Sequence, residues 1–262
     1  MSDQKSNKEN LVEVKEIALQ YHSLIGEIPA LADINFSVKT GEFISIVGPS
    51  GCGKSTLLDI IAGLLPASSG KVFIAGNEVV GPTPLVGYMP QSDQLFEWRT
   101  IWKNVILGLE IKGKINAERT AYAEKLLASY GLADFKKTYP SQLSGGMRQR
   151  AALIRTLAVN PELLLLDEAF SALDYQTRLA MTDVVKEIIK KEHKTAVLVT
   201  HDLSEAISMS DRIVVLTKRP ARVKRIYEVH LTGDTSSALQ CRKAPEFGEY
   251  FQSIWKELDV HV

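Results

Sequence analysis

The sequence is poor in cysteine and has no excess of either charge. Only 2 of its 262 residues are cysteines, Cys52 and Cys241, so a disulfide framework is excluded and a reducing compartment is indicated. Its 31 lysines and arginines balance its 31 aspartates and glutamates. A dedicated nucleic-acid-binding protein carries a basic excess, and we therefore expect no nucleic acid among the partners.

Long apolar runs are also missing. No stretch approaches the roughly 18 consecutive apolar residues of a spanning helix, and the polar start MSDQKSNKEN lacks the apolar segment of a secretory signal. We expect a chain that does not cross a membrane, although it could lie at one through a partner. The composition, 45% hydrophobic and 24% charged, is that of a globular protein with one large domain or a core with a subdomain.

Five short apolar runs predict buried strands, because they are rich in aliphatic and β-branched residues, as is typical of strands covered on both faces. Between the runs, apolar residues recur with helical spacing, as at Leu57, Ile60 and Ile61. Strands that alternate with amphipathic helices indicate an α/β fold with a mainly parallel sheet. The runs are residues 43–47, 86–89, 163–166, 195–200 and 213–217.

Other segments break this alternation. Residues 1–10 are polar and aperiodic and predict a flexible tail. Residues 11–42 contain two alternating segments, which predict an N-terminal antiparallel β subdomain. Residues 92–160 are mostly helical in pattern and predict an inserted helical subdomain. Residues 226–262 predict a C-terminal helical extension rich in aromatic side chains.

The strongest motif is the glycine-rich segment 48–56, GPSGCGKST, which fits G-x-x-x-x-G-K-[ST] between a strand and a helix. Backbone N–H groups of such a loop and the start of the helix bind phosphate oxygens. We expect Lys54 to reach the β- and γ-phosphates of a nucleotide and Ser55 to ligate Mg²⁺. Chance alone gives the pattern in about 1 in 100 chains of this length. The residues assigned to the nucleotide here are Gly48, Ser50, Gly51, Cys52, Gly53, Lys54, Ser55 and Thr56.

Polar residues follow three of the predicted strands. Asp167 and Glu168 end one strand, and the carboxyl end of a parallel strand lies beside such a loop. We expect Asp167 to hold the magnesium ion and Glu168 to orient or deprotonate an attacking water. His201 is expected to contact the γ-phosphate, and Gln91 to contact the metal or the water. The alternatives are a solvated strand end for the acidic pair and a structural role for the histidine.

The segment 143–150, LSGGMRQR, resembles the signature of ABC-type ATPases, and the motifs above stand in that family's order. The resemblance spans about residues 11–225 and implies a P-loop NTPase core, ATP and Mg²⁺ as cofactors, and ATPase activity. By the same resemblance Tyr21 stacks on adenine, Gln91 is the Q-loop glutamine, Asp174 closes the D-loop (171–174), and His201 is the switch histidine. Met147 and Ala169 depart from the usual glutamine and proline, which removes no catalytic group.

The signature residues Ser144, Gly145 and Gly146 open a helix with a hydroxyl and free N–H groups, which is a second anion site. The resemblance implies that this site faces the γ-phosphate held by a second copy, so that two chains enclose two ATP molecules head to tail. ATP hydrolysis then opens the pair and drives an attached membrane permease.

Four segments resemble importers of the nitrate, sulfonate, taurine and bicarbonate group: 147–150, 167–178, 200–206 and 218–220. This likeness implies a solute-binding protein as a further partner and a peripheral position on the cytoplasmic face of the cell membrane. Phe96 and Trp98 are expected to line the permease groove, with subdomain core as the alternative; for Trp102 both readings stand.

Competing functions remain open on sequence alone. They are a soluble ABC ATPase of repair or translation, an importer subunit for a vitamin precursor or other small molecule, an exporter, and a module that binds ATP without turnover. The single copy of each motif, the lack of a long coiled-coil insertion and the presence of Lys54, Glu168 and His201 favour the transport ATPase.

Overall fold

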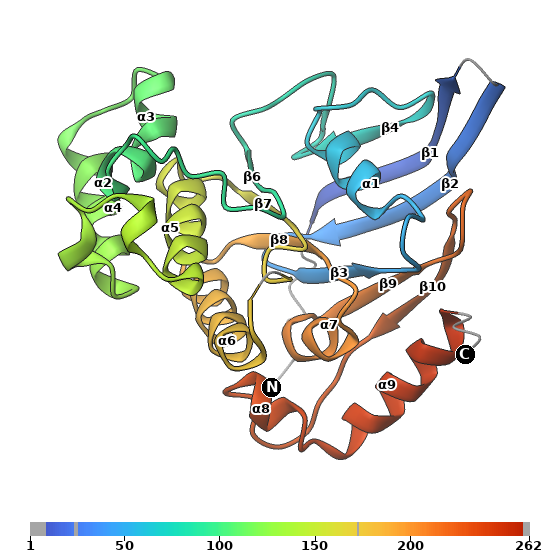
Figure 1. Ribbon diagram of the computed structural model, residues 1–262. Coiled ribbons are helices and arrows are strands. Elements are labelled where there is room, and N and C mark those ends of the chain that lie inside the picture. The colour runs from blue at the N-terminus through green and yellow to red at the C-terminus, as the bar shows by residue number, and fades with distance from the viewer. Residues whose placement is uncertain (1–8, 24–25, 172, 259–262) are drawn as a thin grey trace, which may run out of the picture.

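The computed structural model describes residues 9–23, 26–171 and 173–258, and Figure 1 shows a helical lobe beside a lobe built on two sheets. The larger sheet has the strand order β10-β9-β3-β8-β7-β6. Its neighbouring strands are parallel except for β10, which runs antiparallel to β9. Its strands are β3 (Phe43–Val47), β6 (Val86–Met89), β7 (Leu163–Asp167), β8 (Thr195–Val199), β9 (Arg212–Leu216) and β10 (Val223–Glu228).

The parallel core follows directly from the five apolar runs of the sequence. Every residue of β3, β7 and β8 is buried, because helices cover both faces of the sheet. Separate apolar clusters lie on its two faces, so Leu164 and Leu166 of β7 belong to one cluster and Leu163 and Leu165 to another. The predicted α/β class with a mainly parallel sheet is confirmed.

A second, antiparallel sheet has the order β2-β1-β4-β5. Its strands are β1 (Asn10–Ser23), β2 (Gly26–Lys39), β4 (Ser69–Ile74) and β5 (Asn77–Glu78). The sequence predicted the segment 11–42 as antiparallel but not β4 and β5, which are short and carry mostly exposed residues. Helix α1 (Lys54–Ile61) contributes Leu57 and Leu58 to the apolar cluster that joins the two sheets.

The helical lobe falls within the predicted insertion, residues 92–160. It contains α2 (Ile101–Val105), α3 (Leu107–Ile111), α4 (Ala117–Ser129), the 3-10 turns η1 (Ala133–Phe135) and η2 (Pro140–Gln142), and α5 (Gly145–Ala158). Helix α5 is its centre, since α2, α3 and α4 all pack on it. Apolar residues of α5 share one cluster with α6 (Tyr175–Lys191), which ties this lobe to the sheet.

Both predicted ends of the cassette need adjustment. Residues 1–8 of the predicted tail lie outside the described residues, and Asn10 already belongs to β1. The limit set at residue 225 falls inside β10, which continues to Glu228. This edge strand is partly exposed and carries three charged side chains, Lys224, Arg225 and Glu228, so its sequence resembles a solvated run rather than a buried strand.

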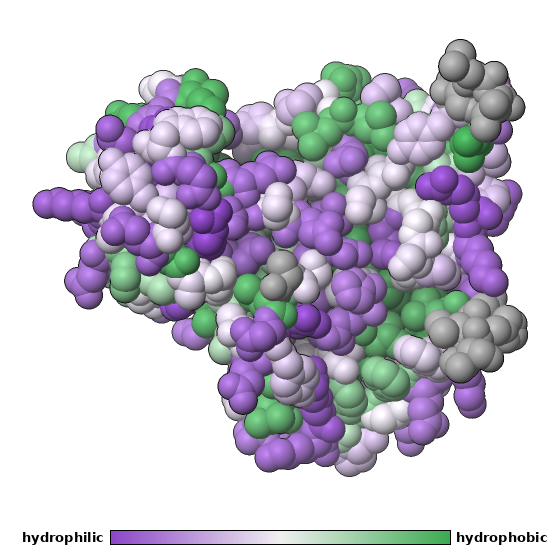
Figure 2. Space-filling view, viewed as in Figure 1, coloured by the Kyte–Doolittle hydropathy of each residue, from purple (hydrophilic) through white to green (hydrophobic). Residues whose placement is uncertain are grey.

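The extension beyond β10 is helical and packs on the body. It contains α8 (Ala238–Cys241) and α9 (Pro245–Glu257), and α9 contacts α7 (Leu203–Met209). Phe247 and Ile254 bury the apolar side of α9 in a cluster with Leu203 and Ile207 of α7. None of the helices in the described part of the chain is both long enough and apolar enough to span a membrane. Figure 2 shows hydrophilic residues over much of the viewed face, with scattered hydrophobic patches.

Replacing Leu164 by alanine should lower the free energy of unfolding by about 2–5 kcal/mol, because this side chain is fully buried in β7. Urea denaturation measures the change. Val80→Ala is the matched control: Val80 is 92% exposed, so its loss should stay below about 0.5 kcal/mol. Similar losses for the two variants would contradict the burial of Leu164.

Candidate functional site

The glycine-rich loop lies between the end of β3 and the start of α1. Gly51 and Gly53 have φ angles of 70° and 118°, in the left-handed region that strains other residues. A Cβ atom on Gly53 would also lie 2.9 Å from Cδ2 of Leu31 on β2. The backbone conformation and the close approach of β2 therefore both require glycine at this position.

Lys54 lies buried along this loop rather than extending into solvent. Its Nζ donates hydrogen bonds to the carbonyls of Gly48 at 2.9 Å and Pro49 at 3.1 Å. The loop and the start of α1 surround a pocket, so the lysine charge and the first N–H groups of the helix act together on any anion that enters it. The pocket is lined by Ser50, Gly51, Gly53, Lys54, Ser55, Thr56, Glu168 and Arg219.

Asp167 closes one side of the loop. Its Oδ1 accepts a 2.9 Å hydrogen bond from the Ser55 hydroxyl, and its Oδ2 accepts a longer one, 3.4 Å, from the Tyr88 hydroxyl. Burial raises the pKa of Asp167, and the bond from Ser55 opposes that rise. The Tyr88 hydroxyl also donates to Asp59 Oδ1 at 3.0 Å. Sequence reasoning missed Tyr88 and Asp59, because a tyrosine inside a strand and an aspartate inside a helix carry no motif.

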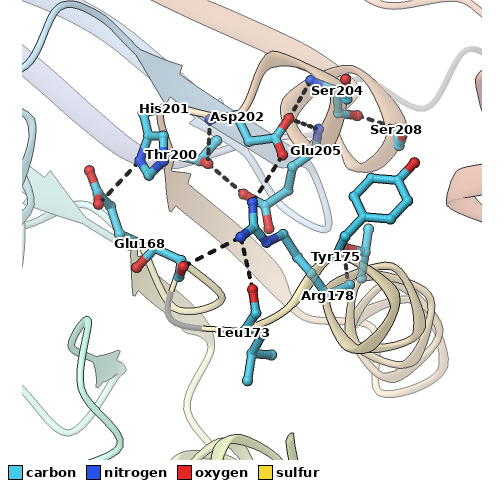
Figure 3. Close-up of polar contacts among 12 residues, drawn as sticks. Glu168, Leu173, Tyr175, Arg178, Thr200, His201, Asp202, Ser204, Glu205 and Ser208 are labelled. Atoms are coloured by element: carbon cyan, nitrogen blue, oxygen red, sulfur yellow. Dashed lines mark hydrogen bonds and ion pairs between the residues drawn. The ribbon is translucent and has the colours of Figure 1, made fainter. Parts of the chain in front are cut away.

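Glu168, Gln91 and His201 meet at the mouth of the pocket. Nδ1 of His201 lies 3.3 Å from Oε2 of Glu168, as Figure 3 shows, and Nε2 of Gln91 donates to the same oxygen at 3.4 Å. Gln91 also donates to Oγ of Ser171 at 3.3 Å. Glu168 has a φ of 43°, so the chain turns sharply as it leaves β7. Three residues chosen from separate strand ends thus form one cluster.

Tyr21 reaches the loop from the antiparallel sheet. Its hydroxyl lies 3.1 Å from Oγ1 of Thr56, and its side chain is partly exposed. The Tyr21 side chain thus lies beside the last residue of the loop.

The remaining predicted residues do not line this pocket. Ser144 caps α5 by accepting a 3.4 Å hydrogen bond from Met147 N, and Asp174 caps α6 through Thr177 N at 3.1 Å. Ser144 and Gly145 are exposed, whereas a Cβ on Gly146 would lie 2.6 Å from Cγ2 of Thr177. One residue of the predicted D-loop, Ala172, lies outside the described residues. A single chain therefore holds the loop and the signature at separate places.

A polar network lies behind His201 and was not predicted. Arg178, in the first turn of α6, donates to the carbonyl of Leu173 at 2.9 Å and to Oδ2 of Asp202 at 3.4 Å (Figure 3). Oδ1 of Asp202 caps α7 by accepting from the N–H groups of Ser204 at 2.8 Å and Glu205 at 3.2 Å. Arg178 thereby connects the segment before α6 to the residue that follows His201.

Glu205 is the buried acid of this network. One carboxylate oxygen accepts a short hydrogen bond from Oγ1 of Thr200, and the other has no hydrogen-bond partner among the described residues. Burial raises the pKa of Glu205 to about 7, with the negative charge of Asp202 adding to the rise and the positive charge of Arg178 opposing it. The side chain is therefore partly protonated near neutral pH.

The sequence profile of the family described as "ABC transporter" matches residues 31–171, more than half of the chain. The chain belongs to the ABC transporter family. This ABC cassette is 48% identical over 250 residues to the uncharacterized ABC transporter ATP-binding protein YtlC of Bacillus subtilis (strain 168), with 95% of this chain and 96% of the relative covered. The predicted family is thus confirmed.

Two further relatives of this ABC cassette have names that state a substrate. The taurine import ATP-binding protein TauB of Roseobacter denitrificans is 39% identical over 234 residues, with 87% of each chain covered. The nitrate import ATP-binding protein NrtD of Synechocystis sp. is 40% identical over 233 residues, with 87% of this chain and 88% of the relative covered.

Solved structures of an ABC cassette share this fold. The dimeric structure of MJ0796, a bacterial ABC transporter cassette, has a TM-score of 0.73 and 32% identity, and the match covers 84% of this chain and 99% of that one. A post-hydrolysis state of the same cassette, bound to ADP and Pi, gives a TM-score of 0.71. The chain is an ABC ATPase with the P-loop NTPase fold.

Changing Glu205 to glutamine should alter the pH dependence of stability. With a pKa of about 7 in the folded chain against an ordinary 4.5, Glu205 stabilises the fold fully at low pH and loses that contribution as the pH rises through 7. Glu205→Gln cannot ionise, so its free energy of unfolding relative to wild type should rise by about 2 kcal/mol between about pH 5 and about pH 8.

Denaturation at several pH values measures this difference, and the exposed Glu162→Gln is the control. A constant offset between Glu205→Gln and wild type over the whole pH range would contradict the buried, raised pKa.

Proposed function

We propose that this ABC ATPase powers the import of a small anion, and that its catalytic residues are Glu168, His201 and Gln91. The observation that supports this most is the convergence of these three side chains at the mouth of the loop pocket, with the Ser55–Asp167 pair beside them. The nucleotide, the metal and the attacking water all need groups at this one place.

The residues present fit a magnesium ion. Mg²⁺ prefers a few oxygen ligands from the protein and takes the rest from phosphates and water. The Ser55 hydroxyl, the Asp167 carboxylate and the amide oxygen of Gln91 supply such oxygens, and no cluster of three or more His, Cys, Asp or Glu side chains competes for a metal among the described residues. When bound, the ion neutralises charge on the phosphate oxygens.

Glu168 is placed to activate water. The water oxygen forms a bond to the γ-phosphorus, the bond from that phosphorus to the β–γ bridging oxygen breaks, and the water proton passes to the Glu168 carboxylate. His201 holds Oε2 of Glu168 from one side and Gln91 from the other, which limits the carboxylate to one orientation. Lys54 and the backbone of the loop hold the phosphates, and Tyr21 stacks on the adenine.

A second copy of the chain completes each site in this proposal. Ser144, Gly145, Gly146 and Asp174 lie outside the loop pocket of their own chain, while Ser144 and Gly145 are exposed and open a helix. The similar MJ0796 cassette is dimeric. A head-to-tail pair would bring the signature of one chain to the γ-phosphate bound by the other, with two-fold symmetry.

A membrane permease and a solute-binding protein are the further proposed partners, with the ATPase at the cytoplasmic face of the membrane. Trp98 is 76% exposed and its ring lies 4.9 Å from that of Phe96, centroid to centroid, which supports a docking surface rather than subdomain core for this aromatic pair. Trp102 instead packs against the buried cluster of the helical lobe, with Lys136 over its ring, which favours the core reading.

The proposed solute is a small anion such as nitrate, a sulfonate, taurine or bicarbonate. Relatives named for taurine and nitrate import support this class, whereas the relative YtlC has no stated substrate. The alternatives are an ATPase subunit for a vitamin precursor or other small molecule, and an ABC ATPase that is not coupled to transport. Identification of the permease encoded beside this chain would separate these cases.

Glu168→Gln should retain ATP binding but lower the turnover number at least about 100-fold, because the amide cannot accept the water proton. Steady-state phosphate release and nucleotide binding measure the two effects. ATP should also hold the variant as a dimer, which size-exclusion chromatography detects. Glu162→Gln, which changes the exposed residue just before β7, is the matched control and should turn over normally. Normal hydrolysis by Glu168→Gln would show that the assigned role is wrong.

Replacing Phe96 and Trp98 together by alanine should weaken association with the membrane permease while leaving ATP-dependent dimerisation intact. Co-purification of the permease from membranes measures the association. Trp255→Ala, which removes an exposed aromatic ring from α9, is the control. Equal permease yield for the double variant and the control would count against the docking surface.

A further inference from the structure

The turn between β9 and β10, residues 217–222, is held in a fixed shape by its own hydrogen bonds. Thr217 N donates to the carbonyl of Arg222 at 3.0 Å, and Arg222 N donates to the Thr217 hydroxyl oxygen at 2.9 Å. That hydroxyl in turn donates to the carbonyl of Lys218 at 3.0 Å. The turn is therefore a closed unit that presents residues 218–220 at its tip.

Contacts with β2 and β9 place this turn beside the glycine-rich loop. Ala221 N donates to the carbonyl of Ala30 at 2.9 Å, and Ala32 N donates to the carbonyl of Ala221 at 2.9 Å. Leu31 lies between those two residues of β2 and packs on the loop. A Cβ atom on Gly53 would lie 2.9 Å from Cδ2 of Leu31. Backbone bonds thus set the distance between the turn and the loop.

The residue before the turn also contacts the loop. Cβ of Leu216 would lie 3.1 Å from a Cβ on Gly48, the first residue of the glycine-rich segment. The turn is accordingly fixed against both ends of the loop, through β9 at Gly48 and through β2 at Gly53.

Arg219, at the tip of the turn, is one of the residues that line the loop pocket. The other lining residues belong to the glycine-rich loop, except Glu168, which follows β7. Arg219 forms no ion pair with any described residue, whereas the nearby Arg222 lies 3.7 Å from Asp33 and Arg212 bonds to Glu42. Burial raises the pKa of the Cys52 thiol, and the positive charges of Lys54 and Arg219 oppose that rise, which agrees with a guanidinium close to the loop.

Charge explains what an arginine does here. The ionisable side chains that line the pocket are Lys54, Glu168 and Arg219. Without Arg219, the charges of Lys54 and Glu168 cancel. The phosphates of a nucleotide would then be attracted only by the dipoles of the backbone N–H groups. With Arg219 the lining carries a net positive charge, and the guanidinium offers a planar fork of N–H donors that matches phosphate oxygens.

We propose that Arg219 binds phosphate oxygens of the nucleotide held by the glycine-rich loop, as a second cation opposite Glu168. The proposal rests on the ATP site described under the proposed function. It gives a role to the segment Lys218-Arg219-Pro220, which the transport mechanism does not otherwise use. Because Arg219 lines the pocket together with the loop that holds the phosphates common to ATP and ADP, it contributes to the binding of both nucleotides.

Equilibrium binding of ATP and ADP to the full chain, by calorimetry in magnesium-free buffer so that no hydrolysis occurs, tests the proposal. Arg219→Gln should weaken both nucleotides about tenfold, since it removes charge-assisted hydrogen bonds from a partly solvated site. Arg219→Lys should recover most of the affinity, because it keeps the charge. The affinity of Arg219→Gln should also fall less steeply with added salt than that of wild type.

Arg222→Gln is the matched control, since it removes one positive charge from the same turn without changing the pocket lining. Its nucleotide affinity should stay within about twofold of wild type. Equal affinities for Arg219→Gln and Arg222→Gln would overturn the proposal. The same conclusion follows if Arg219→Gln changes only dimerisation, because the guanidinium would then face the second copy rather than the nucleotide.

Lys54→Ala separates this inference from the proposed function. Loss of ATP binding in Lys54→Ala together with unchanged binding in Arg219→Gln refutes the role of Arg219 and leaves the ATP site in place. Unchanged binding in Lys54→Ala refutes the ATP site itself. Thermal unfolding without nucleotide tests whether each variant is folded, and Arg219→Met, which also removes the charge, replaces Arg219→Gln if that variant is unfolded.

Discussion

Parallel pairing of buried strands is the constraint on which the rest of this molecule depends. In the register of the sheet, Met89 lies beside Leu166, Asp167 beside Val199, and Val47 beside Val215. All these strands therefore end along one edge of the sheet. The residues that follow each strand lie close together there, even when they are far apart in the sequence. The loop, the acidic pair, the glutamine, the histidine and the turn that carries Arg219 each follow one of these strands.

Polar and charged side chains are buried along this edge, and hydrogen bonds to specific partners offset the cost of burying them. Lys54 bonds to two carbonyls, and Asp167 accepts from a serine and a tyrosine. Among the described residues Glu205 has a partner for only one of its oxygens, and burial raises its pKa to about 7, so the carboxyl group is partly protonated near neutral pH. Neighbouring residues thereby hold the charged side chains near the loop in fixed positions. Phosphoryl transfer requires such preorganised charges.

Much of this arrangement could be predicted from the sequence because two of its signals are strong. Fully buried strands are continuous apolar runs, and the glycine-rich loop has a fixed pattern between a strand and a helix. The confirmed fold rests on those signals, and the confirmed family rests on the signature segment 143–150 together with the order of the motifs. The polar strands β4, β5 and β10 gave no such signal, because half-exposed strands mix charged and apolar residues without a long alternation.

Side chains that act through tertiary contacts were equally invisible. Tyr88 and Arg178 lie at ordinary positions of a strand and a helix, and they bond to Asp59 and Asp202, which are 29 and 24 residues away in the sequence. Arg219 could be singled out as part of a subtype segment, but only the hydrogen bonds to β2 bring it to the pocket. Distance in sequence, rather than unusual chemistry, hid these residues.

The contact between Gly146 and Thr177 has a mechanical consequence. The Thr177 side chain packs directly on the backbone of Gly146, since a Cβ atom on Gly146 would lie 2.6 Å from Cγ2 of Thr177. This contact couples the first turns of α5 and α6, whose caps are Ser144 and Asp174. In the proposed head-to-tail pair, a rotation that moves the two turns together would carry both caps the same way, so both would engage and leave the second copy in step.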